Sequence, residues 1–308
     1  MNRSMKIFYF IVAFGLLSAC KSNVSPEQKS VDETAALYKA QPSDSSAQAY
    51  VNALGHYAEV TGYADSTSAS YVLQAAKISA EHNQLKQAMG YYKIYMVEYP
   101  DRPDQADRLE EVIAIVDKLQ QPEINQILYR SFASRFPQDS RTATFQAKIE
   151  NKEIAADSIL RFIGMNMFND STFRLNEARA NLYIDACEAA VMADPTLPNA
   201  PEFLHRSAET ARTLRNIPQA IKLYDWIINK YPTHTRAATS LFLKAFTYDN
   251  DLKNFAEAGK FYNEFLAKYP NNEFAGSAKF LLENLGKSEA ELKKMLEDKA
   301  NSRKDSVQ

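Results

Sequence analysis

The chain has 308 residues, enough for one large domain or two of ordinary size. It contains 42 Ala against 8 Gly and 11 Val, and this balance argues against β-sandwiches, β-barrels and Gly-rich nucleotide-binding folds. The formal net charge of −2 gives no electrostatic reason to expect nucleic acid as a partner. The composition therefore predicts an all-α protein.

The first 19 residues have the layout of a secretory signal peptide. Two basic residues precede an apolar core of eleven residues, Ile7 to Leu17, which is too short to span a bilayer as a stable helix. The small residues Ser18 and Ala19 follow, and then Cys20. We therefore expect residues 1–19 to be removed during export.

Cys20 closes a segment, Leu17-Ser18-Ala19-Cys20, that resembles the bacterial lipobox. The resemblance implies that Cys20 becomes the first mature residue and carries acyl chains that anchor the chain in a membrane. Lys21 follows instead of Asp, and no acidic cluster comes after it, which in lipoproteins of this kind implies the periplasmic face of the bacterial outer membrane. The alternatives are an ordinary cleaved signal with a chance Cys, or an uncleaved anchor.

Two helices are expected next. Residues 21–30 are interpreted as a tether that ends at a capping box, Ser30-x-x-Glu33, and this box predicts a helix over 31–40. Turn-forming residues at 41–46 separate it from a second helix near 46–60. A segment that contains Gly and Ser follows and is expected to end this second helix.

A repeated pattern covers much of the remaining chain. Four segments end in an aromatic residue followed by Pro, at Pro100, Pro137, Pro232 and Pro270, while Pro195 follows an Asp. A Tyr stands eight residues before each of the four, a large apolar residue stands five before, and three of the four have an Ala twelve before. These offsets place the residues on one face of a helix, which the Pro ends.

The residues at these offsets are predicted to form the core. They are Tyr92, Tyr95 and Ala88; Tyr129 and Phe132; Tyr224, Ile227 and Ala220; Tyr262, Phe265 and Ala258. Another helix is expected before three of these helices, over 71–81, 201–214 and 237–249, with Ala76, Ala208 and Ala245 where the paired helices approach closely. Helix–turn–helix units that recur in this way form an α-solenoid.

These units resemble tetratricopeptide repeats (TPRs). The family's Ala, aromatic residue and Pro have the spacing of Ala220, Tyr224 and Pro232, and the triplets that end at Pro100 and Pro270 match equally well. The spacing of 37–38 residues is longer than the family's unit, and the Trp and Leu-Gly of its first helix are absent. The repeats look like those of outer-membrane lipoproteins of the BamD and CpoB (YbgF) type. This resemblance implies a TPR-like solenoid that binds other proteins.

The distance between Pro137 and Pro195 exceeds one repeat by 21 residues. Helices are predicted over 152–167 and 175–193 in this irregular insert, with a junction at 166–172. A further helix over 288–299 is expected to cover the last repeat. The predicted division is a signal peptide (1–19), a lipid-anchored tether and first helix (20–45), N-terminal repeats (46–165), C-terminal repeats (166–287), and a capping helix with a frayed tail (288–308).

Motifs for catalysis or cofactor binding are missing from the sequence. It has no G-x-G-x-x-G, Walker loop, H-E-x-x-H or C-x-x-C, and its four His residues are dispersed without metal-ligand spacing. Adjacent acids such as Glu110 and Glu111 point to different sides of a helix, which suits solvation. We therefore expect no cofactor, no metal and no enzymatic activity. Cys187 lies in an apolar run and is predicted to be buried.

Partner contacts in TPR proteins come from the first helix of each unit. By this resemblance, the corresponding residues are Lys77, Glu202, His205, Glu209 and Arg212. A solvated helix face explains the same charges equally well.

The leading hypothesis is a lipid-anchored periplasmic scaffold that holds envelope proteins during cell-envelope assembly or maintenance. The alternative hypothesis is a lipoprotein that binds glycan or peptidoglycan, for which exposed Tyr side chains would be suited.

Overall fold

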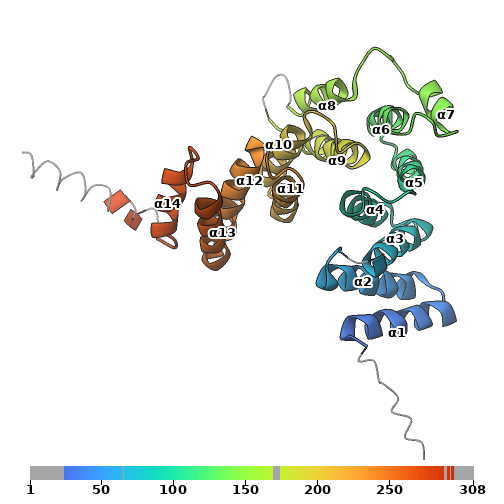
Figure 1. Cartoon of the computed structure of the whole chain (residues 1–308), viewed down its shortest axis with the longest axis horizontal. Helices are drawn as coiled ribbons and strands as arrows, with labels where there is room; N and C mark the ends of the chain where they lie inside the picture. The colour runs from blue at the N-terminus through green and yellow to red at the C-terminus, as the bar shows by residue number, and fades with distance from the viewer. Residues whose placement is uncertain (1–23, 65, 169–173, 288–289, 292, 295–308) are drawn as a thin grey trace, which may run out of the picture. The chain divides into compact units, whose positions relative to one another are not determined.

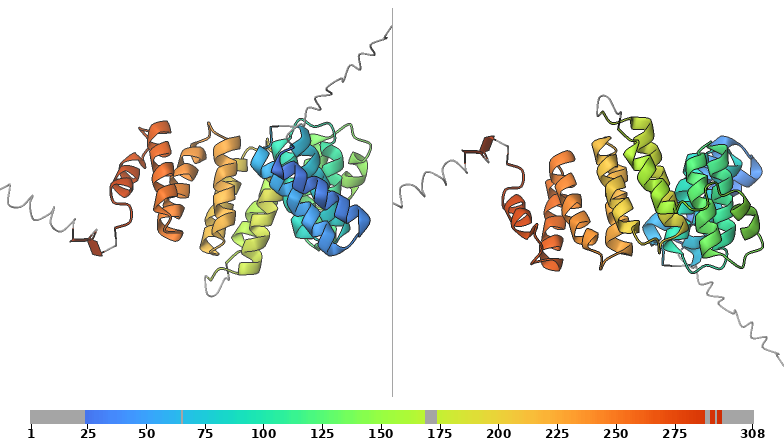
Figure 2. Two further views of the ribbon diagram at one scale, coloured as in Figure 1. Left: turned by 90° about the horizontal axis from the view of Figure 1, so that it is seen from below. Right: turned by 90° about the horizontal axis from the view of Figure 1, so that it is seen from above.

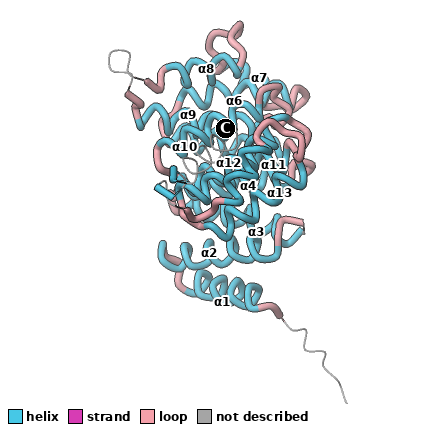
Figure 3. Tube along the Cα trace, turned by 90° about the vertical axis from the view of Figure 1, so that its left-hand side faces the viewer, coloured by secondary structure: helices cyan, strands magenta, loops and turns pink. Residues whose placement is uncertain are grey.

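The structure is a computed structural model that describes residues 24–64, 66–168, 174–287, 290–291 and 293–294. Its described residues form α-helices joined by loops, with no β-strand among them (Figures 1 and 3). An isolated backbone bridge joins Phe168 to Leu175. Within the described part of the chain, no helix combines the length and the apolar character needed to cross a membrane. The signal peptide, Cys20 and most of the predicted capping segment lie outside the described residues.

The fold divides into two units, with the boundary between Ala75 and Ala76 inside helix α3. The first unit contains α1, α2 and the first part of α3. Their bounds are Pro26–Ala40, Asp44–Thr61 and Ser66–Glu81. Helices α1 and α2 pack together, and the Tyr57 and Tyr71 rings meet edge to face with centroids 4.9 Å apart.

The predicted start of the first helix was wrong. Helix α1 begins at Pro26 instead of residue 31, because the Ser25 side chain accepts a hydrogen bond from the backbone N–H of Gln28 and Pro26 fits the first turn. Ser30 therefore lies inside the helix and does not cap it. The second helix agrees with prediction, and its true cap is Ser43, which exchanges hydrogen bonds with Ser46.

The second unit holds the repeats and the insert. Its helices are α4 (Leu85–Glu98), α5 (Gln105–Lys118), α6 (Pro122–Arg135), α7 (Thr142–Ala147), α8 (Ala156–Met165), α9 (Glu177–Ala193), α10 (Ala200–Thr213), α11 (Ile217–Lys230), α12 (Thr235–Phe246), α13 (Phe255–Lys268) and α14 (Ala275–Glu283). Consecutive helices pair as α5 with α6, α10 with α11, and α12 with α13, and α11 also packs on α12. Figure 2 shows the last two pairs side by side. The predicted fold, a TPR-like array of helix–turn–helix units, is confirmed.

Each repeat helix ends where the aromatic-Pro pair predicts. Tyr99, Phe136, Tyr231 and Tyr269 each occupy the position after the last helical residue. The backbone N–H of each aromatic residue still donates to the carbonyl four residues earlier, whereas the Pro that follows has no N–H to continue the helix. The same spacing correctly predicts the core, since every Tyr, apolar residue and Ala of the pattern is at most 7% exposed.

The insert consists of α7, an irregular loop, α8 and the segment that leads into α9. A single helix over 152–167 was predicted, but α8 begins only at Ala156. Arg130 of α6 explains the difference, because its guanidinium donates to the backbone carbonyls of Glu150, Asn151 and Ile154 and holds them outside a helix. The predicted junction at 166–172 lies partly outside the described residues.

Helix α9 connects the insert to both sets of repeats. It packs on α4 and α6 before the insert, on α8 within it, and on α10 after it. Cys187 on α9 is buried, as predicted.

Helix α12 also differs from prediction at its end. The sequence pattern predicts a helix that continues to residue 249, whereas the α-helix ends at Phe246 and a π-helical turn covers Thr247–Asp251. The wider turn brings Asp251 against Arg212 of α10, and this ion pair leaves the Asp251 side chain only 4% exposed.

Candidate functional site

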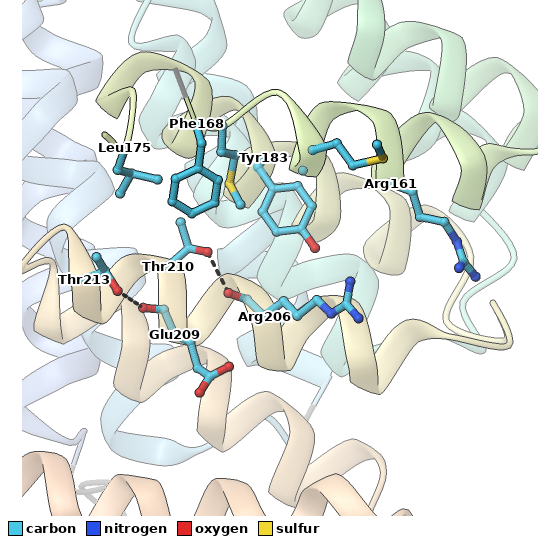
Figure 4. Close-up of a pocket in the computed structure, with 11 residues that line it drawn as sticks. Arg161, Phe168, Leu175, Tyr183, Arg206, Glu209, Thr210 and Thr213 are labelled. Atoms are coloured by element: carbon cyan, nitrogen blue, oxygen red, sulfur yellow. Dashed lines mark hydrogen bonds between the residues drawn. The ribbon is translucent and has the colours of Figure 1, made fainter. Parts of the chain in front are cut away.

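A pocket of 560 Å³ lies where the insert meets the first helix of the next repeat. We call it the insert pocket. Helices α8, α9 and α10 and the residues around the Phe168–Leu175 bridge build it (Figure 4). It is lined by Arg161, Gly164, Met165, Met167, Phe168, Leu175, Tyr183, Arg206, Glu209, Thr210 and Thr213. The surface that faces the pocket is mostly apolar, with Met165, Met167, Phe168 and Leu175 as its apolar side chains, and the charged residues are two arginines and one glutamate.

Helix α8 is apolar on more than one face, which gives the pocket an exposed apolar rim. It packs on α6 and α9 and buries Leu160 and Ile163. Phe162 is nevertheless 65% exposed and Met165 is 79% exposed, and Phe168 beyond the helix is 50% exposed. A surface helix normally confines its apolar residues to the face that meets the core. The additional apolar residues of α8 therefore lack a covering partner among the described residues.

The floor of the pocket depends on a close contact between α8 and α9. A Cβ atom at position 164 would lie 3.0 Å from Cε2 of Tyr183, so Gly164 allows the two helices to approach. The Tyr183 side chain is 2% exposed. Burial raises its pKa well above the usual range, whereas hydrogen bonding and the positive charge of Arg206 act in the opposite direction.

Cys187 lies one turn after Tyr183 on α9 and behaves as a structural residue. It is fully buried, and burial raises the pKa of its thiol to about 12. A thiol with so high a pKa is a poor nucleophile. The hydroxyl of Tyr183 therefore meets a buried, neutral thiol on one side and the Arg206 guanidinium on the other.

The charged residues of the pocket are arranged asymmetrically. Figure 4 shows the guanidinium groups of Arg161 and Arg206 on the side of the Tyr183 hydroxyl, and Phe168 and Leu175 on the other side. The Glu209 carboxylate points away from these rings, and one of its oxygens lies 3.6 Å from Nε2 of His205. The pocket thus presents an apolar side and a positively charged side.

Four of the five residues predicted to contact a partner lie along α10, but their side chains have different surroundings, and Lys77 lies apart from them on α3. Glu209 lines the insert pocket. Glu202 and Arg212 are engaged in ion pairs, Glu202 with Arg236 of α12 at 2.9 Å and Arg212 with Asp251. Lys77 of α3 lies 3.9 Å from Glu111 of α5 and does not line the pocket.

The prediction for His205 needs correction. Its side chain is only 3% exposed and cannot form the surface contact that was expected. The reason is that α10 packs against both α9 and α12, so its neighbours cover the face that carries His205. Burial also lowers the pKa of this imidazole, which favours the neutral form.

Residues that do form the site were not singled out from the sequence. Phe162, Met165, Phe168 and Arg161 lie in the insert, where the repeat spacing offers no alignment, whereas Arg206 lies on the aligned helix α10 but outside the positions predicted to contact a partner. Two signals were available. The insert adds 21 residues to the regular spacing, and residues 159–168 contain more apolar side chains than one buried helix face requires.

A second hollow of 460 Å³ lies beside the loop that precedes α8. Arg130 lines it, but its guanidinium is occupied by backbone carbonyls of that loop. This hollow therefore reflects the way the loop is held. In the part of the chain that the structure describes, no three His, Cys, Asp or Glu side chains form a group that could hold a metal ion.

Comparison with known proteins identifies one repeat. Residues 239–272, which span most of α12, the π-turn and α13, match the tetratricopeptide repeat family model. No curated protein matches the chain. Among solved structures, the chain is similar to the TPR2AB-domain:pHSP90-complex of yeast Sti1, with 14% identity and a TM-score of 0.29 over 83% of this chain and 96% of that one. The chain therefore contains a tetratricopeptide repeat directly after the helix pair that adjoins the insert pocket.

Proposed function

We propose that this chain is a lipid-anchored scaffold of the bacterial cell envelope, and that a partner protein docks at the insert pocket. The observation that carries the proposal is the exposure of Met165 and Phe168, which line the insert pocket, together with that of Phe162, one turn before Met165 on the same helix. Apolar side chains grouped in this way on a surface mark interaction sites, because covering them releases water. The helical repeats provide the rigid support that such a docking site needs.

The polar groups of the pocket suit a protein partner better than a sugar. A glycan presents many hydroxyls, each of which needs a hydrogen-bond partner when it loses water. The hydroxyls of Thr210 and Thr213 already donate to carbonyls of their own helix, at 2.7 and 2.9 Å. The apolar lining instead matches the side chains of a polypeptide segment. Glycan or peptidoglycan binding is therefore the weaker hypothesis.

The anchor belongs to the proposal through the sequence around Cys20. Five residues separate Cys20 from Pro26, where α1 begins. Even fully extended, this stretch spans at most about 20 Å. If Cys20 carries acyl chains, α1 is held close to the membrane surface, and the scaffold meets partners that lie in or near the outer membrane.

The test is photo-crosslinking in intact bacterial envelopes, with a photoreactive phenylalanine analogue at position 162. The control carries the same analogue at Phe280 of α14, an aromatic residue that is 41% exposed and lies far from the insert in the sequence. We expect a defined protein adduct from position 162, absent from position 280. We also expect it to be lost in the Cys20→Ala variant, which cannot be lipidated. Equal adducts from both positions, or binding of muropeptides by the purified protein without any protein adduct, would contradict the proposal.

A further inference from the structure

We infer that the insert pocket selects a partner segment in which a large apolar side chain lies within a few residues of an Asp or Glu. The inference rests on the proposed function, because it names the chemistry of the segment that docks in the same pocket. It follows from the position, the availability and the surroundings of two arginines.

The position of the arginines divides the pocket into two sides. Phe168 and Leu175 line one side, and the guanidinium groups of Arg161 and Arg206 lie at the other, beyond the Tyr183 hydroxyl (Figure 4). An apolar side chain that enters between Phe168 and Tyr183 would place neighbouring residues of its own chain beside the arginines. The pocket therefore suits a segment with two different side chains close together.

Within the described part of the chain, the positive charge of this side is only partly paired with acidic side chains. Arg206 forms no ion pair there. Arg161 is 59% exposed and has a single acidic neighbour, Asp157, at 3.4 Å on the same helix. The third charged residue of the lining, Glu209, turns its carboxylate toward His205. Among the described residues, a carboxylate from a partner would find the Arg206 guanidinium without an acidic partner, and it would share the Arg161 guanidinium with Asp157.

The surroundings would make such an ion pair selective. A guanidinium offers a planar fork of donors that matches a carboxylate, and the attraction grows when neighbouring apolar groups exclude water. Phe162, which does not line the pocket and is 65% exposed, extends the apolar surface outside it. This extension favours a polypeptide segment, which covers a larger area than a single acyl chain in the pocket would.

Peptide selection on the purified mature protein tests the inference. A phage-displayed library of random twelve-residue peptides is selected, and one enriched peptide is synthesised with a fluorophore for affinity measurements. We expect enriched peptides to share a large apolar residue with an Asp or Glu within about four positions. We also expect the Arg206→Glu variant to bind the peptide about 10-fold or more weakly, and Arg206→Lys to bind with intermediate affinity.

The control makes the same charge change away from the pocket. Arg102, in the loop between α4 and α5, is exposed, and Arg102→Glu should leave the peptide affinity unchanged. Circular dichroism and the melting temperature establish that each variant is folded. A Phe162→Ser/Phe168→Ser variant tests the apolar side separately and should also lose the peptide.

The outcomes separate the two claims. Loss of binding in Phe162→Ser/Phe168→Ser with full binding in Arg206→Glu would overturn the inference and leave the proposed docking site standing. Binding that no pocket variant changes would overturn both. Arg206-dependent binding of phosphatidylglycerol vesicles, with no peptide enriched, would identify an anionic lipid as the ligand and overturn the inference as well.

Discussion

Nζ of Lys93 lies 2.7 Å from Oε2 of Glu188, and this contact joins two helices whose paired residues are 95 positions apart in the chain. Lys93 belongs to α4, before the insert, and Glu188 belongs to α9, after it. The second carboxylate oxygen of Glu188 accepts a hydrogen bond from the side-chain amide of Gln219 on α11. Glu188 thus connects three helices at the point where the insert interrupts the regular repeats.

The first prediction concerns this connection. The Glu188 side chain is 12% exposed and that of Lys93 is 25% exposed, so removing one charge leaves the other partly desolvated. We expect Glu188→Gln to lower the free energy of unfolding by about 1–3 kcal/mol. Urea denaturation measures the change. The control is Glu33→Gln, because Glu33 pairs with Lys29 at 67% and 73% exposure and should contribute little. Equal effects of the two variants would contradict the importance of the connection.

The second prediction is a pH dependence at Asp185, one turn before Glu188 on α9. Asp185 is exposed, but the surrounding helices partly desolvate its carboxylate, and this, together with the charge of Glu188, raises its pKa to about 6, although Lys86 and Lys93 and a hydrogen bond from Gln121 oppose the shift. A carboxyl whose folded pKa exceeds its unfolded value of about 3.9 loses stabilisation as the pH rises between these two values. The ionised form is therefore the less stable one in the folded protein.

Replacing Asp185 with Asn should remove this loss. We expect Asp185→Asn to match the wild type near pH 4 and to be more stable by about 1 kcal/mol at pH 7, after allowance for the part of the side chain that still contacts water. Thermal unfolding between pH 4 and pH 8 measures the difference. A difference that is the same at all pH values would show that the effect does not come from the titration of Asp185.

The third prediction uses two helical glycines with different surroundings. Replacing Gly with Ala in a helix normally stabilises it by about 0.5–1 kcal/mol. Gly90 of α4 has no atom within 4 Å of the new methyl group, so Gly90→Ala should show this gain. At Gly164 the methyl would press on Tyr183 at 3.0 Å, and we expect a loss of about 1–3 kcal/mol. If Gly164→Ala is also stabilising in urea denaturation, α8 and α9 do not approach as closely as described.

The fourth prediction separates the ring of a repeat Tyr from its hydroxyl. Tyr224 is 0% exposed, and its buried hydroxyl oxygen has no hydrogen-bond partner among the residues that the structure describes. Tyr224→Phe should therefore change the free energy of unfolding by less than about 0.5 kcal/mol, whereas Tyr224→Ala should cost about 3–5 kcal/mol through the cavity it leaves. Calorimetry on both variants tests this. A large loss in Tyr224→Phe would mean that the hydroxyl has a partner in solution.

The regular repeats could be predicted from the sequence because local spacing determines them. A helix that buries one face places its core residues three, four and seven positions apart, and the Pro after Tyr99, Phe136, Tyr231 or Tyr269 ends each helix whatever surrounds it. Both features depend only on neighbours in the sequence. The core of the repeats and the four helix ends at the aromatic-Pro pairs were accordingly predicted, whereas the end of α12, which no Pro marks, was not.

The site could not be predicted in the same way, because it depends on contacts between distant segments. The local sequence predicts His205 to be a surface residue of α10, but in the structure α9 and α12 pack against α10 and cover the face that carries it. The sequence pattern predicts a helix in the loop before α8, but Arg130, some twenty residues earlier in the sequence, binds the carbonyls of this loop. The spacing of apolar residues in α8 also does not say which of its faces remains uncovered.

The central claim is that the exposed apolar side chains of the insert hold a partner protein. The most direct test is quantitative crosslinking and mass spectrometry in intact envelopes, comparing the wild type with Phe162→Ser/Met165→Ser. The matched control is Leu252→Ser/Phe280→Ser, which removes two apolar side chains that are 45% and 41% exposed outside the insert. The account predicts that the insert variant loses its crosslinked partner by about 10-fold or more while the control keeps it. Full recovery of the partner with a folded insert variant would contradict it.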